Sequence, residues 1–342
     1  MIEVSGEDAV ESQARFLDLR APVSGLAWIG ERACFALGDG RIAFVNLDGS
    51  GARAAVDDAA ILSAVRSPCG TAIITGDDAG VVRRTYVDGA SDVLGTFAGN
   101  WIDHVAASPE SGLIAAAAGK QVAVWTRGAQ VPSHRFTLDS TVGGLAFDGK
   151  GKRLAVAHYG GASLYFAMSP QSRPMPLEWK GSHIAITIAA RADYVVTGTQ
   201  ELGLHGWRLP GREDMAMSGY VGKTRSFSWN RKGTWLATSG DTSAVIWPFE
   251  GKTGPMGKQA QLLAPSTSQV TRVAFHPAYD VLAVGYADGA VVLAQLHEDM
   301  FVPVAASDQS AISALEWDDT GRFLAWGSED GNGGMLDMRK AA

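Results

Sequence analysis

A repeat of about forty residues runs through the chain and constrains its fold more than any other feature. With Thr224 as position zero, apolar residues follow three, five and twelve positions later, at Phe227, Trp229 and Leu236. Comparable patterns begin at eight places, which are Val23, Leu62, Ile102, Val142, His183, Thr224, Val270 and Ile312. Successive starts lie 39 to 46 residues apart. Such a period indicates an array of similar structural units that bury their apolar faces against one another.

Each repeat has the pattern of a β-meander. In residues 224–247, short alternating apolar segments are separated by polar turns at 230–233 and 240–243. A fourth, less regular strand is expected before the next start, for example at 261–263. Four short antiparallel strands at regular spacing are typical of a propeller blade.

The eighth repeat ends too close to residue 342 to contain its own fourth strand, whereas residues 14–19 alternate and precede the first repeat. Because closure protects exposed sheet edges, we expect these residues to complete the last blade. The predicted fold is all-β: a single eight-bladed β-propeller of four-stranded antiparallel blades, with the ring closed by the N-terminal strand. Seven blades are the alternative, if the first repeat is discarded. We expect residues 1–13 to be a flexible N-terminal segment and residues 14–342 to form the propeller.

Composition favours an intracellular protein that does not depend on nucleic acid. The net charge is −7 and the pI is about 5.5, which argues against nucleic acid or a membrane as the main partner. The acidic N-terminal residues contain no apolar run of the kind found in a signal peptide. Cys34 and Cys69 lack metal-site spacing, so we expect two free thiols in the cytoplasm.

The turns before the third strands resemble those of the WD-repeat β-propeller family. The segments that show this are SGDTSAVIW at 239–247, GYADGAVVL at 285–293 and GSEDGNGGMLD at 327–337, and the resemblance covers residues 15–338. It implies that Asp288 and Asp330 are turn aspartates and that His183 stands near the histidine position of the family. No tryptophan at the end of a third strand is followed by aspartate, so we expect few complete polar tetrads. The Ala- and Gly-rich composition suggests a bacterial origin.

The sequence contains no motif that indicates a catalytic or cofactor site. We find no Gly-x-Ser-x-Gly elbow, no phosphate-binding Gly-Lys-Ser/Thr loop and no paired Cys motif. The seven histidines are spread over several repeats, and His158 and His183 are the only plausible pair for a metal. We therefore predict no enzyme activity, no cofactor and no metal.

The loops that enter the first strands are the candidate binding surface. Residues beside position zero should point outward, and turn residues should lie next to them. Exposed aromatic and arginine side chains are the usual anchors of interfaces. The candidate partner-binding residues are Trp101, Asp103, Tyr159, Lys223, Arg225, Tyr286 and Glu329.

Together with the family resemblance, these features predict a monomeric, non-enzymatic interaction scaffold that binds a protein or peptide on one face of the propeller. The alternative is a propeller enzyme, or a binder of a small ligand or metal, that uses the central channel. Because fold alone is a weak guide to function, both hypotheses remain open at this stage.

Overall fold

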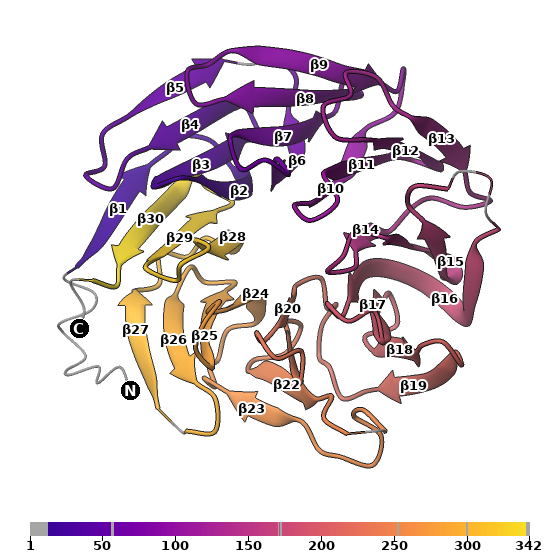
Figure 1. The fold of residues 1–342 in the computed structure, drawn as a ribbon. Coiled ribbons are helices and arrows are strands. Elements are labelled where there is room, and N and C mark those ends of the chain that lie inside the picture. The colour runs from indigo at the N-terminus through magenta and orange to yellow at the C-terminus, as the bar shows by residue number, and fades with distance from the viewer. Residues whose placement is uncertain are drawn as a thin grey trace. The chain divides into compact units, whose positions relative to one another are not determined.

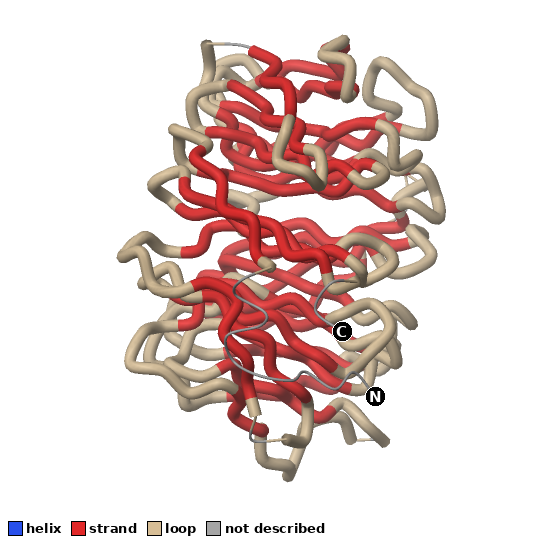
Figure 2. Tube along the Cα trace, turned by 90° about the vertical axis from the view of Figure 1, so that its left-hand side faces the viewer, coloured by secondary structure: helices blue, strands red, loops and turns tan. Residues whose placement is uncertain are grey.

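The computed structural model describes residues 13–339 except 56, 57, 170, 172, 252 and 299. These residues form thirty β-strands and no helix, in agreement with the predicted all-β class (Figures 1 and 2). Consequently, there is no helix in this part of the chain that could cross a membrane. The N-terminal segment that we expect to be flexible lies, apart from Gln13, outside the described residues.

The chain divides into two compact units. Unit 1 contains the described residues up to Leu37, Ala43–Ala52 and those from Tyr220 onward, and unit 2 contains Gly38–Ile42 and Arg53–Gly219. The prediction of one propeller domain over residues 14–342 stays a prediction.

Unit 1 holds four sheets of four strands each, although residues 38–42 and 53–55 of the first sheet are grouped with unit 2. The strands are β2 (Val23–Ile29), β3 (Arg32–Leu37), β4 (Arg41–Val45) and β5 (Gly51–Ala55); β20 (Phe227–Trp229), β21 (Trp235–Thr238), β22 (Ala244–Pro248) and β23 (Gln261–Leu263); β24 (Val270–Phe275), β25 (Val281–Tyr286), β26 (Val291–Gln295) and β27 (Phe301–Ala305); and β28 (Ile312–Trp317), β29 (Phe323–Ser328), β30 (Asn332–Asp337) and β1 (Ala14–Asp18).

Unit 2 holds two four-stranded sheets and one six-stranded sheet. The strands are β6 (Ile61–Arg66), β7 (Ala72–Asp77), β8 (Val81–Tyr86) and β9 (Ser91–Thr96); β10 (Ile102–Ser108), β11 (Leu113–Ala118), β12 (Gln121–Trp125) and β13 (His134–Thr137); and β14 (Gly144–Phe147), β15 (Arg153–Phe166), β16 (Met175–Ile188), β17 (Tyr194–Thr199), β18 (Leu204–Arg208) and β19 (Glu213–Met217).

The prediction of an eight-bladed propeller closed by the N-terminal strand is wrong, because the described strands form seven sheets. The fourth and fifth repeats share the six-stranded sheet. Two strands of fourteen residues, β15 and β16, run through positions where separate strands were expected. The first part of β16 pairs with β15 of the fourth repeat and its second part pairs with β17 of the fifth, so this continuous strand joins the two repeats. The alternative prediction was seven blades with the first repeat discarded. That reason is wrong as well, because the first repeat forms its own sheet, β2–β5.

Strand β1 completes the last sheet of unit 1. It pairs antiparallel with β30 from Ala14 opposite Leu336 to Asp18 opposite Asn332. The ring of Phe16 lies edge-on to Trp326, with the ring centroids 6.1 Å apart. Residues from the two ends of the chain therefore share one sheet.

A β-bulge near the start of the first strand recurs in both units. In six sheets the register shifts by one residue after the first pair, for example between Ile102 and His104 and between Ile312 and Ala314. A bulge leaves one residue unpaired and re-aims its neighbours. Because the bulge recurs, the residues on either side of position zero are more exposed than the buried residue at position zero itself.

The second repeat begins one residue earlier than the sequence pattern indicates. The amide of Ser67 donates to the carbonyl of Ala72, as Asp318 does to Phe323 in the last repeat. Ser67 follows Ile61 by six residues, and Asp318 follows Ile312 by six. Ile61, which is 4% exposed, therefore occupies position zero in place of Leu62. A slip of one residue exchanges the two faces of a strand, so this correction matters for every side chain of β6.

Neighbouring sheets interlock where position zero meets a glycine. In unit 2, a Cβ built on Gly76 of β7 would lie 2.3 Å from Cγ2 of Ile102, at the start of β10. In unit 1, Gly285 and Gly327 make the same close contact with Ile312 and Val23. Each glycine provides the hollow that the next sheet fills. The residue pattern thus encodes contact between sheets as well as within them.

Hydroxyl groups reinforce the same contacts. The Oγ1 of Thr271 donates to the carbonyl of Ile312 at 2.7 Å, and the Oγ of Ser313 donates to that of Val23 at 2.6 Å. In unit 2, the Oγ of Ser63 donates to the carbonyl of Ile102 at 2.8 Å. These bonds link side chains of one sheet to the backbone of the next.

The hydrophobic core lies between successive sheets. In unit 1, Trp28 stacks on Phe323 with the ring centroids 5.7 Å apart, and its Nε1 donates to the carbonyl of Glu316 at 3.1 Å. In unit 2, the fully buried Trp125 donates from Nε1 to the carbonyl of Leu94 at 2.9 Å. Each indole therefore buries apolar area and reaches the backbone of an adjacent sheet.

Filling the hollow at Gly76 should destabilise the fold. We expect Gly76→Val to lower the free energy of unfolding by roughly 1–3 kcal/mol, because the added methyl groups collide with Ile102. The control is Gly203→Ala, whose Cβ would meet its nearest neighbour at an ordinary 3.5 Å. Urea unfolding of both variants measures the difference. Equal stability of the two would contradict the proposed interlock.

Candidate partner-binding surfaces

The loop before β20 presents two basic side chains in unit 1. Thr224 is fully buried, and its hydroxyl donates to the carbonyl of Ser239 at 2.9 Å. The amide of Arg225 in turn donates to the Oγ of Ser239 at 3.3 Å. Lys223 and Arg225, on either side of Thr224, are exposed, as the sequence predicts. A fixed backbone therefore holds two cationic side chains in solvent.

Arg272 adds a third cation that the sequence analysis missed. It lies on β24, where its Nε donates to the carbonyl of Ser313 at 2.7 Å and its Nη1 donates to that of Thr271 at 2.9 Å. Burial lowers the pKa of Arg272; the charge of Glu329 opposes this shift and that of Arg225 adds to it. The exposed Glu329 is thus the acidic member of this group. The sequence signal that could have identified Arg272 is its place two residues after position zero of the seventh repeat.

Tyr286 is not a surface residue, contrary to the sequence-based expectation. It is 2% exposed and belongs to the core between β20–β23 and β24–β27. Its hydroxyl donates to the carbonyl of Ala264. The last residue of β25 therefore points into the core, where an aromatic ring with a satisfied hydroxyl is well accommodated.

Unit 2 presents the aromatic candidates. Trp101 is 62% exposed and precedes Ile102, which is fully buried. Asp103, which the register shift leaves out of the ladder, is exposed too. Tyr159 is 68% exposed, and its amide donates to the Oγ of Ser140 at 3.1 Å. Among the contacts of the described residues, none joins Trp101 to Tyr159, so the single binding surface stays a prediction.

His183 belongs to a buried polar chain in the six-stranded sheet. Its Nδ1 lies 2.7 Å from the Oγ1 of Thr197, and the same hydroxyl donates to the carbonyl of His205 at 3.1 Å. Because that hydroxyl has one proton, Nδ1 of His183 must be the donor in the first bond. Trp207 packs at 5.8 Å from the His183 ring. A histidine, a threonine and a tryptophan thus occupy one sheet.

A related arrangement in unit 1 uses tyrosine in place of histidine. The hydroxyl of Tyr220 lies 2.7 Å from the Oγ1 of Thr238 and accepts a hydrogen bond of 2.7 Å from Nε1 of Trp247. Thr238 donates to the carbonyl of Val245, so Tyr220 must donate to Thr238. Tyr220 was not predicted from the sequence, because histidine was the residue expected in such an arrangement.

His158 and His183, the only pair that the sequence left plausible for a metal, are each engaged in other contacts. The two ring nitrogens of His158 lie 2.9 Å from the carbonyl of Tyr159 and 2.9 Å from the Oγ of Ser163. Within the described residues there is no group of three or more His, Cys, Asp or Glu side chains that could hold a metal ion.

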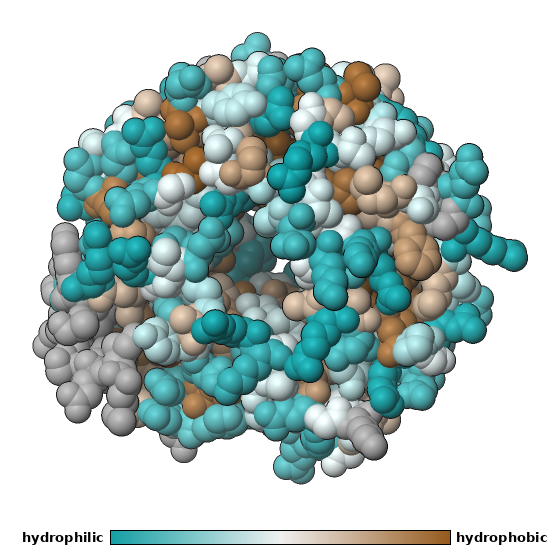
Figure 3. Space-filling view, viewed as in Figure 1, coloured by the Kyte–Doolittle hydropathy of each residue, from teal (hydrophilic) through white to brown (hydrophobic). Residues whose placement is uncertain are grey.

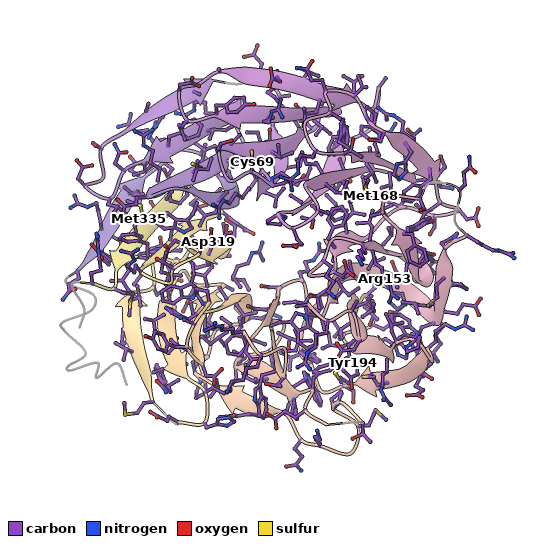
Figure 4. All side chains as sticks on the ribbon, in the orientation of Figure 1. Cys69, Arg153, Met168, Tyr194, Asp319 and Met335 are labelled. Carbon is purple, nitrogen blue, oxygen red and sulfur yellow. The ribbon has the colours of Figure 1, made fainter. Side chains whose placement is uncertain are left out.

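The two cysteines lie in contrasting environments. Cys34 is buried, which raises the pKa of its thiol to about 12. Cys69 is exposed in the turn between β6 and β7 (Figure 4). Burial would raise its pKa, but hydrogen bonds with Ser67 and Thr71 outweigh that effect and lower the pKa to about 7. Both are free thiols, as the sequence predicts.

One face of the molecule is mainly hydrophilic, with scattered apolar side chains (Figure 3). This mixture is ordinary for a protein surface and does not by itself locate a partner. The exposed tryptophan and tyrosine therefore have to be judged by their local geometry.

Comparison with known proteins supports a WD-repeat β-propeller. A model of the anaphase-promoting complex subunit 4 WD40 domain matches residues 273–342, and a model of the WD domain, G-beta repeat, matches residues 216–248. No curated protein matches the sequence.

Solved structures show the same fold at low sequence identity. The computationally designed Ika8 protein is 16% identical, with a TM-score of 0.78 over 93% of this chain and 96% of that one. U3-55K is 16% identical, with a TM-score of 0.65 over 82% and 96% of the two chains. The RRP9 WD40 repeats are 16% identical, with a TM-score of 0.63 over 82% and 95%. These matches concern the fold, and the suggested bacterial origin stays a prediction.

The buried histidine of β18 should make stability depend on pH. His205 is 1% exposed, and burial lowers its pKa to about 4 from 6.5, although Asp214 acts in the opposite direction. Between these values the unfolded chain binds a proton that the folded chain does not, so stability is full above pH 6.5 and falls as the pH drops. We expect His205 to account for a loss of roughly 2 kcal/mol by pH about 5.

The test compares urea unfolding at neutral and mildly acidic pH. His205→Phe, which retains an aromatic ring but cannot titrate, should lose that part of the pH dependence. The exposed His297→Gln should leave it unchanged. An unaltered pH dependence in His205→Phe would show that His205 does not titrate in this way.

Proposed function

We propose that the protein is a non-enzymatic interaction scaffold that binds a protein or peptide through the loops at the starts of its first strands. The principal observation is the contrast between Trp101, 62% exposed, and Ile102, fully buried. The buried residue fixes the backbone while the indole stays free for a partner. A large side chain with few rotatable bonds is the type that anchors interfaces at low entropic cost.

The charged residues of unit 1 favour an acidic segment in that partner. Lys223 and Arg225 are exposed, and the partly buried Arg272 lies within their electrostatic influence. Arginine is well suited to bidentate recognition of carboxylates. Glu329 offsets one of these charges, which leaves a surplus of positive charge in this group.

The WD40 propeller fold supports this proposal, because proteins with this fold are commonly interaction scaffolds. We also propose a cytoplasmic location, since free Cys34 and Cys69 suit a reducing compartment. The net charge of −7 favours a protein or peptide over nucleic acid or an anionic membrane as the main partner.

The proposal predicts selective loss of a partner on mutation. In affinity capture from a native lysate, Trp101→Ala with Tyr159→Ala should reduce recovery of at least one specific protein by about 30-fold, because truncation of an anchor costs about 2 kcal/mol. Lys223→Ala with Arg225→Ala tests the basic surface separately. Quantitative mass spectrometry of the captured proteins measures both effects.

Val131→Ala is the matched control, since Val131 is 71% exposed and lies outside both candidate surfaces. Thermal unfolding of each variant establishes that the fold is retained. If both double variants capture the same proteins as the unmodified chain in the same amounts, these loops are not the binding surface.

A further inference from the structure

A cleft in unit 2 lies outside the surfaces described so far. It has a volume of about 450 Å³ and is formed by the first part of β16 and by the connection between β18 and β19. These strands belong to the six-stranded sheet. The lining residues are Pro176, Glu178, Trp179, Trp207, Gly211, Arg212 and Asp214.

The partly buried Trp179 gives the cleft its aromatic wall, whereas Trp207 is only 2% exposed. The indole of Trp179 stacks on the imidazole of His205, with the ring centroids 3.8 Å apart and the planes within 13° of parallel. Trp207 packs edge-on to the same imidazole at 4.8 Å. The buried His205 therefore fixes the orientation of both indoles before any ligand binds. Such preorganisation reduces the entropic cost of binding.

Carboxylates give the cleft an excess of negative charge. Glu178 and Asp214 are exposed, and Arg212 is the only cationic residue of the lining. The nearby Arg208 donates to Glu213 at 3.0 Å. Oδ2 of Asp214 lies 3.7 Å from Nε2 of His205, which is too far for a hydrogen bond.

His205 leaves that carboxylate uncompensated. Both ring nitrogens of His205 are buried and have no hydrogen-bond partner among the described atoms. Burial lowers the pKa of this imidazole to about 4, so it is neutral near pH 7. The imidazole therefore adds no positive charge beside Asp214.

We propose that this cleft binds an organic ammonium cation, with the charge placed against Trp179 and near Asp214 and Glu178. An indole face attracts a cation electrostatically, and tryptophan does so best among the aromatic residues. Carboxylates in the same cleft add Coulomb attraction. The ammonium group is present both in free quaternary amines and in the lysine side chains of peptides, so the chemistry alone does not separate these two sources.

Calorimetric titration of the full chain with two probes at neutral pH and constant ionic strength tests the proposal. The probes are choline, a free quaternary amine, and an N-acetylated lysine amide, which represents a peptide side chain. At least one should bind, and the tighter one identifies the source of the cation. The neutral carbon isostere of choline, in which carbon replaces nitrogen, should bind at least about 3-fold more weakly than choline if choline is the tighter probe.

Matched variants locate the binding. Trp179→Ala and Asp214→Asn should each raise the Kd about 3- to 30-fold, while Trp179→Phe keeps a weaker aromatic face and should lie between them and the unmodified chain. Glu213→Gln is the control, because Glu213 pairs with Arg208 and does not line the cleft. Absence of binding by both probes, equal binding of choline and its isostere where choline is tighter, or an equal loss in Glu213→Gln would overturn the proposal.

Discussion

The structure depends on contacts between sheets at the starts of first strands, as at Ile102, Ile312 and Val23. A four-stranded meander has two faces, and it can bury them only against its neighbours. At Ile102 and Gly76 the side chain of one sheet enters a hollow on the next, and the hydroxyl of Ser63 binds the carbonyl of the same isoleucine. In unit 1, Ile312 with Gly285 and Thr271 repeats this combination. Dispersion, burial and hydrogen bonding therefore act at one place.

The same constraint produces the candidate surfaces. A bulge follows position zero, so the residues beside it leave the ladder while position zero stays buried. Lys223 and Arg225 are exposed because Thr224 between them is fixed to Ser239. Trp101 is exposed because Ile102 is held by the adjacent sheet. The binding residues are thus placed on rigid supports by the residues that stabilise the fold.

The sequence predicts the all-β class and most strands, because alternation and turn residues are local properties. It does not predict how strands join across repeats: β16 pairs with β15 at one end and with β17 at the other, and this continuity merges two predicted blades into one sheet. Nor does it show whether Ile61 or Leu62 occupies position zero of the second repeat, because both are apolar and a shift of one residue fits the pattern nearly as well. The burial of Tyr286 was not predicted either, because the exposure of a side chain at the end of a strand depends on the neighbouring sheet. The cleft at Trp179 requires residues from β16 and β19, whose proximity has no sequence signal.

Amide hydrogen exchange of an Ile102→Ala variant tests the contact between sheets most directly. Removal of this buried side chain should cost about 2–5 kcal/mol. If the sheets stabilise each other, amides in β6–β9 will lose protection together with those in β10–β13, while the exposed Val131→Ala changes neither. Loss of protection confined to β10–β13 would show that each sheet is stable by itself and would contradict this account.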